Sequence, residues 1–379
     1  MKKSLLNARL FTGEETFEKG FVTFENGRIT AAGPMENYRP GGEETEDCTG
    51  KWLYPGFVDP HCHLGMEEDS LGFPGDDVNE MTDPVTPHLS GLDAVNPTDR
   101  YFAEAAAAGV TTVITGPGSA NPIGGQMIAI KTAGSPRVDE LVLRAPVAMK
   151  MAFGENPKTV YHERKQAPMT RMATAAVIRQ ALEKCRRYME KGGEYDPKME
   201  ALAPVLKGEL PVHMHAHRRD DIFTALRIAK EYGLRCVIVH GTEGHLIARE
   251  LQEAGARVFA GPILTDRSKP ELVNLTPKGP GLLAKAGVPV ALCTDSPVIP
   301  QQYLALCAGL CVREGMDPDS ALAAITSTAA DLCGLGDRVG RIAPGLDADL
   351  ALFSANALSL EGVCLATYIG GQKVYEAAR

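Results

Sequence analysis

The sequence predicts an α/β protein, a (β/α)8 barrel of the TIM type with a small β-sandwich domain that both ends of the chain build together. Eight apolar, strand-like segments alternate with helical segments between residues 54 and 342, and this alternation is typical of a parallel barrel. Short strand patterns with turn signals occupy residues 1–53 and 343–379. With 379 residues, the chain is long enough for a barrel and a satellite domain.

Hairpin signals mark both terminal segments. Residues 21–30 alternate apolar and polar side chains around an Asn-Gly dipeptide at 26–27, which favours a tight turn between two strands. Residues 368–375 contain a second turn signal, the Gly-Gly dipeptide at 370–371. We therefore expect strands from both ends of the chain to form one small β domain.

The elements of the barrel follow from two different periodicities. Strands are predicted from runs of apolar, often β-branched residues, and helices from Ala-rich or amphipathic stretches that separate them. The predicted strands cover residues 54–63, 110–115, 125–131, 145–152, 210–215, 235–240, 258–260 and 288–294. The clearest helices are predicted over residues 97–109, 171–191, 221–230 and 243–254.

The composition argues against several classes of partner. The chain has 39 basic and 48 acidic residues, and its net charge of −9 argues against binding to nucleic acid or anionic membranes. No apolar run approaches the roughly 20 residues of a membrane helix, and the first ten residues make a poor signal peptide. Nine scattered cysteines without a Cys-x-x-Cys motif are typical of reduced thiols, so we expect a cytoplasmic protein.

The first predicted barrel strand ends in a pair of histidines, His61 and His63. Side chains alternate across a strand, so residues two apart point to the same side. Two convergent imidazoles are the start of a metal site, because neutral imidazole suits zinc and similar ions. The spacing alone leaves a second interpretation open, in which both are polar residues of a loop after the strand.

Other predicted strands also carry residues that can bind metal or accept protons. In a (β/α)8 barrel, the chemistry lies at the C-terminal ends of the strands. Each such residue taken alone could be a hydrogen-bonded polar side chain, but together they predict one site at the barrel mouth. They are Lys150 on the fourth strand, His215 and His240 at the ends of the fifth and sixth, and Asp295 after the eighth.

Motifs at five of these strands resemble those of the amidohydrolase superfamily of metal-dependent hydrolases. Within it, the chain looks most similar to the imidazolonepropionase-like and prolidase-like members. The resemblance covers essentially the whole chain, including the return into the β domain at residues 340–350. The motif segments are residues 55–63, 145–154, 212–217, 239–242 and 293–296.

The resemblance implies one or two divalent metal ions, with zinc as the expected metal. It also implies that Lys150 is carboxylated, since a lysine carbamate is a bidentate anion that can bridge two cations; the competing interpretation is a salt-bridged lysine at the barrel mouth. A divalent ion lowers the pKa of bound water toward ~7, and Asp295 is then expected to act as the general base. The implied ligands are His61, His63, Lys150, His215, His240 and Asp295.

We therefore expect a hydrolase that cleaves a C–N bond by metal-activated hydroxide, in a cyclic amide, an N-acyl amide or a dipeptide-type amide. The alternatives are a mononuclear metal-dependent deaminase and a non-catalytic member that kept the barrel as a scaffold. Deaminases of this superfamily, and imidazolonepropionase itself, usually show His-Ala-Glu where this chain has His215-Ala-His217. Because that glutamate serves as a proton shuttle, its absence argues against deamination.

Two further residues are candidates for contact with a small-molecule substrate. His217 comes just after the fifth strand, and Arg267 follows the seventh, where a guanidinium can pair with a carboxylate. For both residues, a position in a solvated loop is the competing interpretation. We also expect the protein to be a homo-oligomer.

Overall fold

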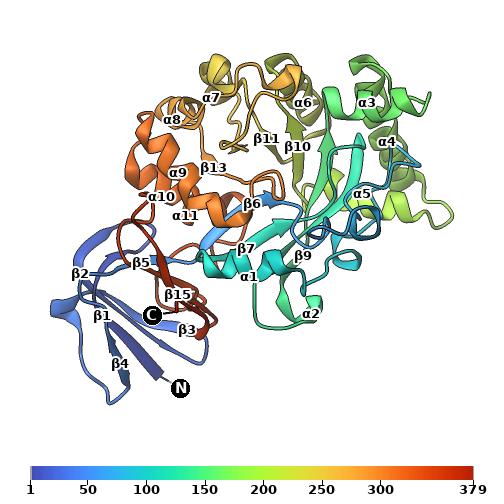
Figure 1. The fold of residues 1–379 in the computed structure, drawn as a ribbon. Helices are drawn as coiled ribbons and strands as arrows, with labels where there is room; N and C mark the ends of the chain where they lie inside the picture. Colours follow the sequence, from blue (N-terminus) through green and yellow to red (C-terminus); the bar gives the residue numbers. More distant parts are fainter. Residues whose placement is uncertain (1, 379) are drawn as a thin grey trace.

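Two eight-stranded sheets organise the protein, one formed by the two chain ends and one forming the barrel (Figure 1). The computed structural model describes residues 2–378. In Figure 1, the blue N-terminal strands and the dark red C-terminal strands lie side by side below the barrel. This terminal sheet comprises β1 (Lys2–Phe11), β2 (Thr16–Glu25), β3 (Arg28–Pro34), β4 (Glu44–Asp47), β5 (Trp52–Pro55), β14 (Leu350–Phe353), β15 (Cys364–Ile369) and β16 (Gln372–Glu376).

Both predicted hairpins are present in the terminal sheet. Between β2 and β3, Asn26 and Gly27 have φ of 50° and 81°, the positive values that a tight hairpin turn requires. Between β15 and β16, Gly370 and Gly371 have φ of 54° and 73°. Antiparallel pairing of β5 with β14 joins the two ends of the chain. The predicted origin of this sheet is confirmed, while the domain boundaries at 53/54 and 342/343 stay a proposal.

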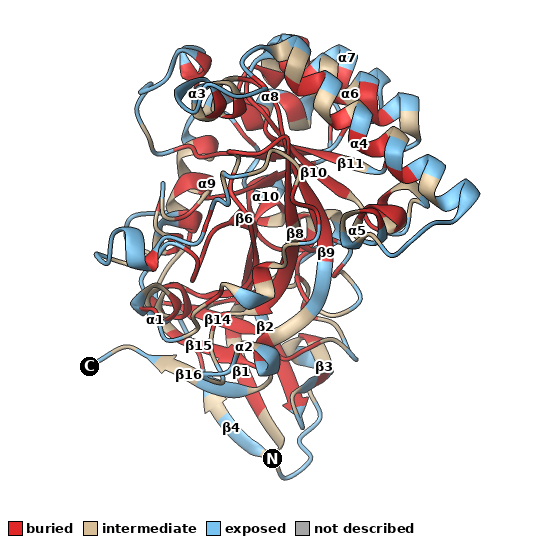
Figure 2. Ribbon diagram, turned by 90° about the vertical axis from the view of Figure 1, so that its right-hand side faces the viewer, coloured by how far each residue is buried: buried red, intermediate tan, exposed pale blue. Residues whose placement is uncertain are grey.

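The barrel sheet follows the chain in order, with each strand beside the next. Backbone hydrogen bonds close the ring, since the Asp295 N–H donates to His61 O at 3.2 Å and the His63 N–H donates to Ser296 O at 2.8 Å. Figure 2 shows these strands mostly buried inside a layer of helices with exposed outer faces, apart from residues 142–146, which are partly or fully exposed. The strands are β6 (Phe57–Cys62), β7 (Val110–Thr115), β8 (Ile123–Lys131), β9 (Val142–Ala152), β10 (Val212–Ala216), β11 (Cys236–His240), β12 (Val258–Ala260) and β13 (Val290–Leu292).

The predicted barrel is confirmed, but the expectation that all of its strands are parallel is wrong for β8. This strand pairs antiparallel with both β7 and β9. Only residues 116–122 connect β7 to β8, and they contain no helix. A parallel connection needs a crossover of a dozen or more residues, so a link this short reverses the chain direction instead.

Helices surround the barrel, and the longest agrees with its predicted range of 171–191. The helix predicted over residues 97–109 begins at Arg100 in the structure, because Asp99 caps its N-terminus. No helix among the described residues is long and apolar enough to span a membrane. The helices are α1 (Arg100–Ala107), α2 (Val138–Leu141), α3 (Glu155–Glu163), α4 (Arg171–Lys191), α5 (Pro197–Leu206), α6 (Arg219–Tyr232), α7 (Ala248–Glu253), α8 (Lys278–Lys285), α9 (Leu304–Arg313), α10 (Pro318–Ala324) and α11 (Ser327–Leu332). Short 3-10 turns are η1 (Met35–Asn37), η2 (Phe73–Gly75), η3 (Gly91–Asp93), η4 (Gly244–Ile247), η5 (Pro270–Leu272) and η6 (Gln301–Tyr303).

Candidate active site

Five histidines from three barrel strands converge at one end of the barrel. His61 and His63 come from the end of β6, His215 and His217 from the end of β10, and His240 from the end of β11. The ring centroid of His240 lies 5.6 Å from that of His61 and 4.5 Å from those of His215 and His217. Parallel neighbouring strands end at the same edge of the sheet, which is why residues so far apart in the chain meet here.

Asp295 joins this group from the segment after β13. Its Oδ1 atom lies 3.4 Å from His61 Nε2 and 3.3 Å from His63 Nε2. Asp295 and His240 both have positive φ, 56° and 73°. Non-glycine residues adopt this conformation rarely, and such backbone outliers cluster at functional sites.

Backbone carbonyls orient two of the five imidazoles. His63 Nδ1 lies 2.7 Å from Gly116 O, and His240 Nδ1 lies 2.8 Å from Gly261 O. A carbonyl oxygen can only accept a hydrogen bond, so Nδ1 carries the proton and Nε2 keeps its lone pair. Metal-binding histidines are typically held in this way by a partner behind the ring.

Hydroxyl groups hold two more imidazoles from behind. His215 Nδ1 lies 2.8 Å from Ser119 Oγ, and His217 Nδ1 lies 2.7 Å from Thr242 Oγ1. The Nε2 atoms of His215 and His240 are buried and have no hydrogen-bond partner among the described residues. Buried polar atoms without a partner are costly, so these two nitrogens point to a group that the chain itself does not supply.

The donor atoms fall into two adjacent groups that could each hold a metal ion. Within each group, one donor atom per residue lies within 4.8 Å of every other. Imidazole nitrogen and carboxylate oxygen are the donors that zinc and similar divalent ions accept, so the residues fit such an ion. The groups are His61, His63 and Asp295, and His215, His217 and His240.

Lys150 lies between the strands that supply these groups. Its side chain is fully buried, and its Nζ atom lies 3.2 Å from His61 Nε2. The lysine therefore faces the histidines, on the side of β9 that strand alternation predicts. Burial lowers the pKa of Lys150 from 10.5 to about 8, because the charged ammonium loses its hydration.

Burial also controls the charge of the other site residues. It lowers the pKa of His61 well below 6.5 and that of His240 to about 4, so both imidazoles are neutral at physiological pH. Neutral imidazole is the form that binds metal. Burial alone would raise the pKa of Asp295, but the imidazoles of His240, His61 and His63 around its carboxylate outweigh that effect and hold the pKa well below 3.8.

The two predicted substrate contacts lie in different surroundings. His217 is buried among the histidines, with its ring stacked on that of His240 at 4.5 Å. Arg267 lies on the exposed segment after β12 and donates to Leu275 O at 2.8 Å. Its guanidinium therefore stabilises its own loop, and contact between Arg267 and substrate stays a prediction.

The sequence interpretation missed Glu271 in η5. Its side chain is 1% exposed, and its Oε1 atom lies 3.6 Å from His217 Nε2. Burial raises its pKa to about 7. A single glutamate in the polar stretch of residues 265–271 carries no pattern that distinguishes it from a solvated loop residue, so sequence offered no signal for it.

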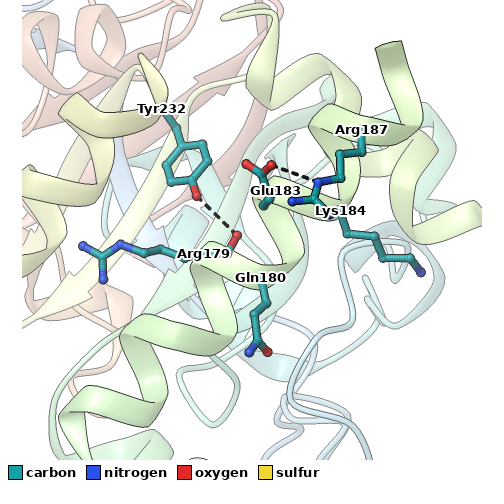
Figure 3. A pocket seen from close by; sticks show the side chains of 6 residues that line it. All are labelled: Arg179, Gln180, Glu183, Lys184, Arg187 and Tyr232. Carbon is teal, nitrogen blue, oxygen red and sulfur yellow. Dashed lines mark hydrogen bonds and ion pairs between the residues drawn. The ribbon is translucent and has the colours of Figure 1, made fainter. Parts of the chain in front are cut away.

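A hollow on the outer face of α4 contains none of the five histidines and neither Asp295 nor Glu271 (Figure 3). Its charged groups have partners nearby, since Arg187 donates to Glu183 at 3.1 Å and Lys184 donates to Asp196 at 2.8 Å. It is therefore a helix surface of mutually paired charges, and the candidate active site is the histidine array at the barrel mouth. The side chains lining the hollow are Arg179, Gln180, Glu183, Lys184, Arg187 and Tyr232.

Known proteins are similar to this chain in sequence. Residues 52–374 match the family model described as "Amidohydrolase family". Amidohydrolase tasK of Hapsidospora irregularis is 30% identical over 94% of this chain, which spans only 40% of that protein's length. Imidazolonepropionase of Acidiphilium cryptum is 29% identical, with 93% of this chain and 92% of that protein covered.

A solved structure extends the likeness to three dimensions. An amidohydrolase from Thermotoga maritima MSB8 is 44% identical, with a TM-score of 0.95 and coverage of 99% of this chain and 100% of that one. The family match extends over most of the chain, and family members are metal-dependent hydrolases, in keeping with the two groups of donor atoms. This chain belongs to the amidohydrolase family.

Proposed function

We propose that this protein hydrolyses a C–N bond of a small molecule, either a cyclic amide, an N-acyl amide or a dipeptide-type amide. The observation that carries the proposal is the pair of adjacent donor groups, in which four of the five imidazoles are held from behind through Nδ1. A site that is only structural would bind its ion with a closed set of ligands, whereas two adjacent groups of three leave positions for substrate. Imidazolonepropionase, a relative covered over almost its whole length, is named for an activity on a cyclic amide.

We propose that His61, His63, His215, His240 and Asp295 hold the metal. A divalent cation at this site, zinc by our proposal, supplies a Lewis acid that activates water and polarises the scissile carbonyl. His217 completes the second group of three donor atoms, and we propose that it orients that site or the substrate.

Asp295 is proposed as the general base. Its Oδ1 atom is next to His61 and His63, at the end of the array where a water molecule would be activated. It takes up the proton of the attacking water and later returns it to the leaving nitrogen. We also propose that Lys150 is carboxylated and would supply an anionic ligand for the metal, since its Nζ atom lies 3.2 Å from His61 Nε2.

Metal content and product analysis together test this function. The zinc-loaded protein would be incubated with cyclic ureides, N-acyl amino acids and dipeptides, with separate assays for new amines and for free ammonia. We expect about two ions per chain and amide hydrolysis that a chelator abolishes and zinc restores. About one ion with ammonia release would instead establish a deaminase, and a chain that binds no metal would establish a scaffold.

The oligomeric state is open to a separate measurement. We propose a homo-oligomer, and light scattering coupled to size-exclusion chromatography would give the mass of the species in solution. A measured mass equal to that of one 40.5 kDa chain would exclude a homo-oligomer.

A further inference from the structure

Glu271 is a buried carboxylate with one oxygen atom that the chain leaves unused. Its Oε2 atom accepts a hydrogen bond from the Glu155 N–H at 3.1 Å, which ties η5 to the start of α3. Its Oε1 atom is buried and has no hydrogen-bond partner within residues 2–378. Leaving a carboxylate oxygen desolvated and unpaired is costly, and such atoms in native proteins call for a partner from outside the chain.

The cations near Glu271 are engaged elsewhere. Arg171 donates to both oxygens of Asp221, at 2.9 and 3.0 Å. Arg218 donates to Asp220 at 2.9 Å, and Lys269 donates to the side chain of Asn156 at 2.9 Å. Arg171, Arg218 and Glu271 line a pocket of about 320 Å³ that contains none of the histidines, so this pocket is separate from the histidine array. The Oε1 atom lies 3.6 Å from His217 Nε2 and is therefore left for a molecule that binds at the histidine array.

The position of Glu271 relative to the metal donors restricts what it can bind. Its Oε1 atom lies 3.6 Å from His217 Nε2 and 4.0 Å from His215 Nε2, yet it is not part of the compact group that those residues form with His240. Glu271 therefore lies beside the second donor group. Asp295 lies 3.4 and 3.3 Å from the nitrogens of His61 and His63 and belongs to the first group, so the two carboxylates lie beside different donor groups.

We propose that Glu271 determines specificity by binding a protonated amine on the acyl side of the scissile bond, so that the substrates are amides of an amino acid with a free ammonium group. This inference rests on the proposed hydrolysis of a C–N bond. The leaving nitrogen must lie near Asp295 to receive its proton, which places the acyl part toward the Glu271 end. An ammonium there supplies both the hydrogen bond and the charge that the Oε1 atom lacks, whereas a carboxylate would be repelled.

Binding of two matched probes to zinc-loaded protein tests the inference without relying on turnover. The probes are the phosphinate analogue of the dipeptide Ala-Ala, with a free amine, and its N-acetyl derivative, both measured by isothermal titration calorimetry. We expect wild-type protein to bind the free-amine probe about tenfold or more tightly than the N-acetyl probe, as one charge-assisted hydrogen bond provides. Glu271→Gln keeps an oxygen for the Glu155 N–H and should bring the ratio close to one.

Glu243→Gln provides the matched control. Glu243 is also a buried glutamate near the site that accepts a backbone N–H, from Arg219 at 3.0 Å, but its second oxygen is occupied by Asn274 at 2.7 Å. This variant should keep the wild-type preference for the free amine, because both of its oxygens already have partners.

Each other outcome overturns a stated claim. Equal binding of the two probes by wild-type protein overturns the role of Glu271 and leaves the proposed hydrolase standing, whatever the stability of the variants. If folded Glu271→Gln protein still prefers the free-amine probe as strongly as wild-type protein does, the role of Glu271 is also overturned and the proposed hydrolase still stands. If neither probe binds zinc-loaded wild-type protein, the inference is overturned, whereas the proposed hydrolysis of a C–N bond fails only if the metal-loaded protein also leaves cyclic ureides, N-acyl amino acids and dipeptides intact.

Discussion

The Nζ atom of Lys150 lies 3.2 Å from the Nε2 atom of His61, and both side chains are completely buried. No carboxylate among the described residues forms an ion pair with this lysine. A buried ammonium without a counter-ion is unfavourable, and the burial that lowers its pKa to about 8 makes the neutral amine accessible near physiological pH. A neutral amine at this position is a nucleophile beside a candidate metal site.

We predict that Lys150 reacts with carbon dioxide, forming an N–C bond and releasing one proton to give a carbamate. Because only the neutral amine reacts, formation should increase as the pH rises through about 8. Apoprotein loaded with zinc and ¹³C-bicarbonate should show one carbamate carbon signal by NMR. Lys150→Met should lose the signal, while Lys158→Met, on the partly exposed α3, should keep it. Full metal loading without ¹³C incorporation would contradict the prediction.

We expect His61→Ala to lower metal content and hydrolysis together, because the variant removes one donor of the group with His63 and Asp295. Mass spectrometry of the metal in purified protein measures the loss directly. His162→Ala, which removes an exposed histidine of α3, should retain the wild-type content. A fully metallated and active His61→Ala protein would show that this group is not the metal site.

Asp295→Asn is expected to reduce turnover by about 100-fold or more while some metal remains bound, since an amide cannot accept the proton. The imidazoles around Asp295 lower its pKa, so the wild-type rate should fall only on the acid side of the ordinary carboxyl range. Rate–pH profiles of the two proteins provide the measurement. Turnover that is unchanged in Asp295→Asn would place the general base elsewhere.

A stability prediction concerns Glu43, in the terminal domain. Hydrogen bonds from its own backbone N–H and from the Ser4 hydroxyl lower the pKa of Glu43 from 4.5 to about 2. A pKa lowered by folding adds stability above pH 4.5, and that stability is lost as the pH falls toward 2. Glu43→Gln should therefore have a lower melting temperature near neutral pH, and the difference should vanish at the acid end. Glu25→Gln, at an exposed position, should leave the melting temperature nearly unchanged at every pH. A Glu43→Gln protein whose melting temperature is lower by the same amount at every pH would exclude a charge effect.

The sequence by itself determined the barrel and much of the candidate site. Strand alternation makes His61 and His63 point the same way, and parallel strands bring their C-terminal ends to one face. Polar residues that follow apolar runs, such as His240 and Asp295, can therefore be assigned to one site from the sequence alone. The Asn-Gly turn at 26–27 was equally predictable, because a tight hairpin requires residues that tolerate positive φ.

The tertiary structure alone decided the features that depend on loops and long-range packing. The reversed β8 follows from a connection too short for a crossover, although its apolar pattern is that of any buried strand. His217 belongs with His215 and His240 because β10 and β11 end at the same level, and Arg267 is held by its own loop. Glu271 reaches the site because the Glu155 N–H holds its carboxylate in place. Such contacts join residues distant in sequence, and their free energy depends on how the whole chain packs, which no local periodicity encodes.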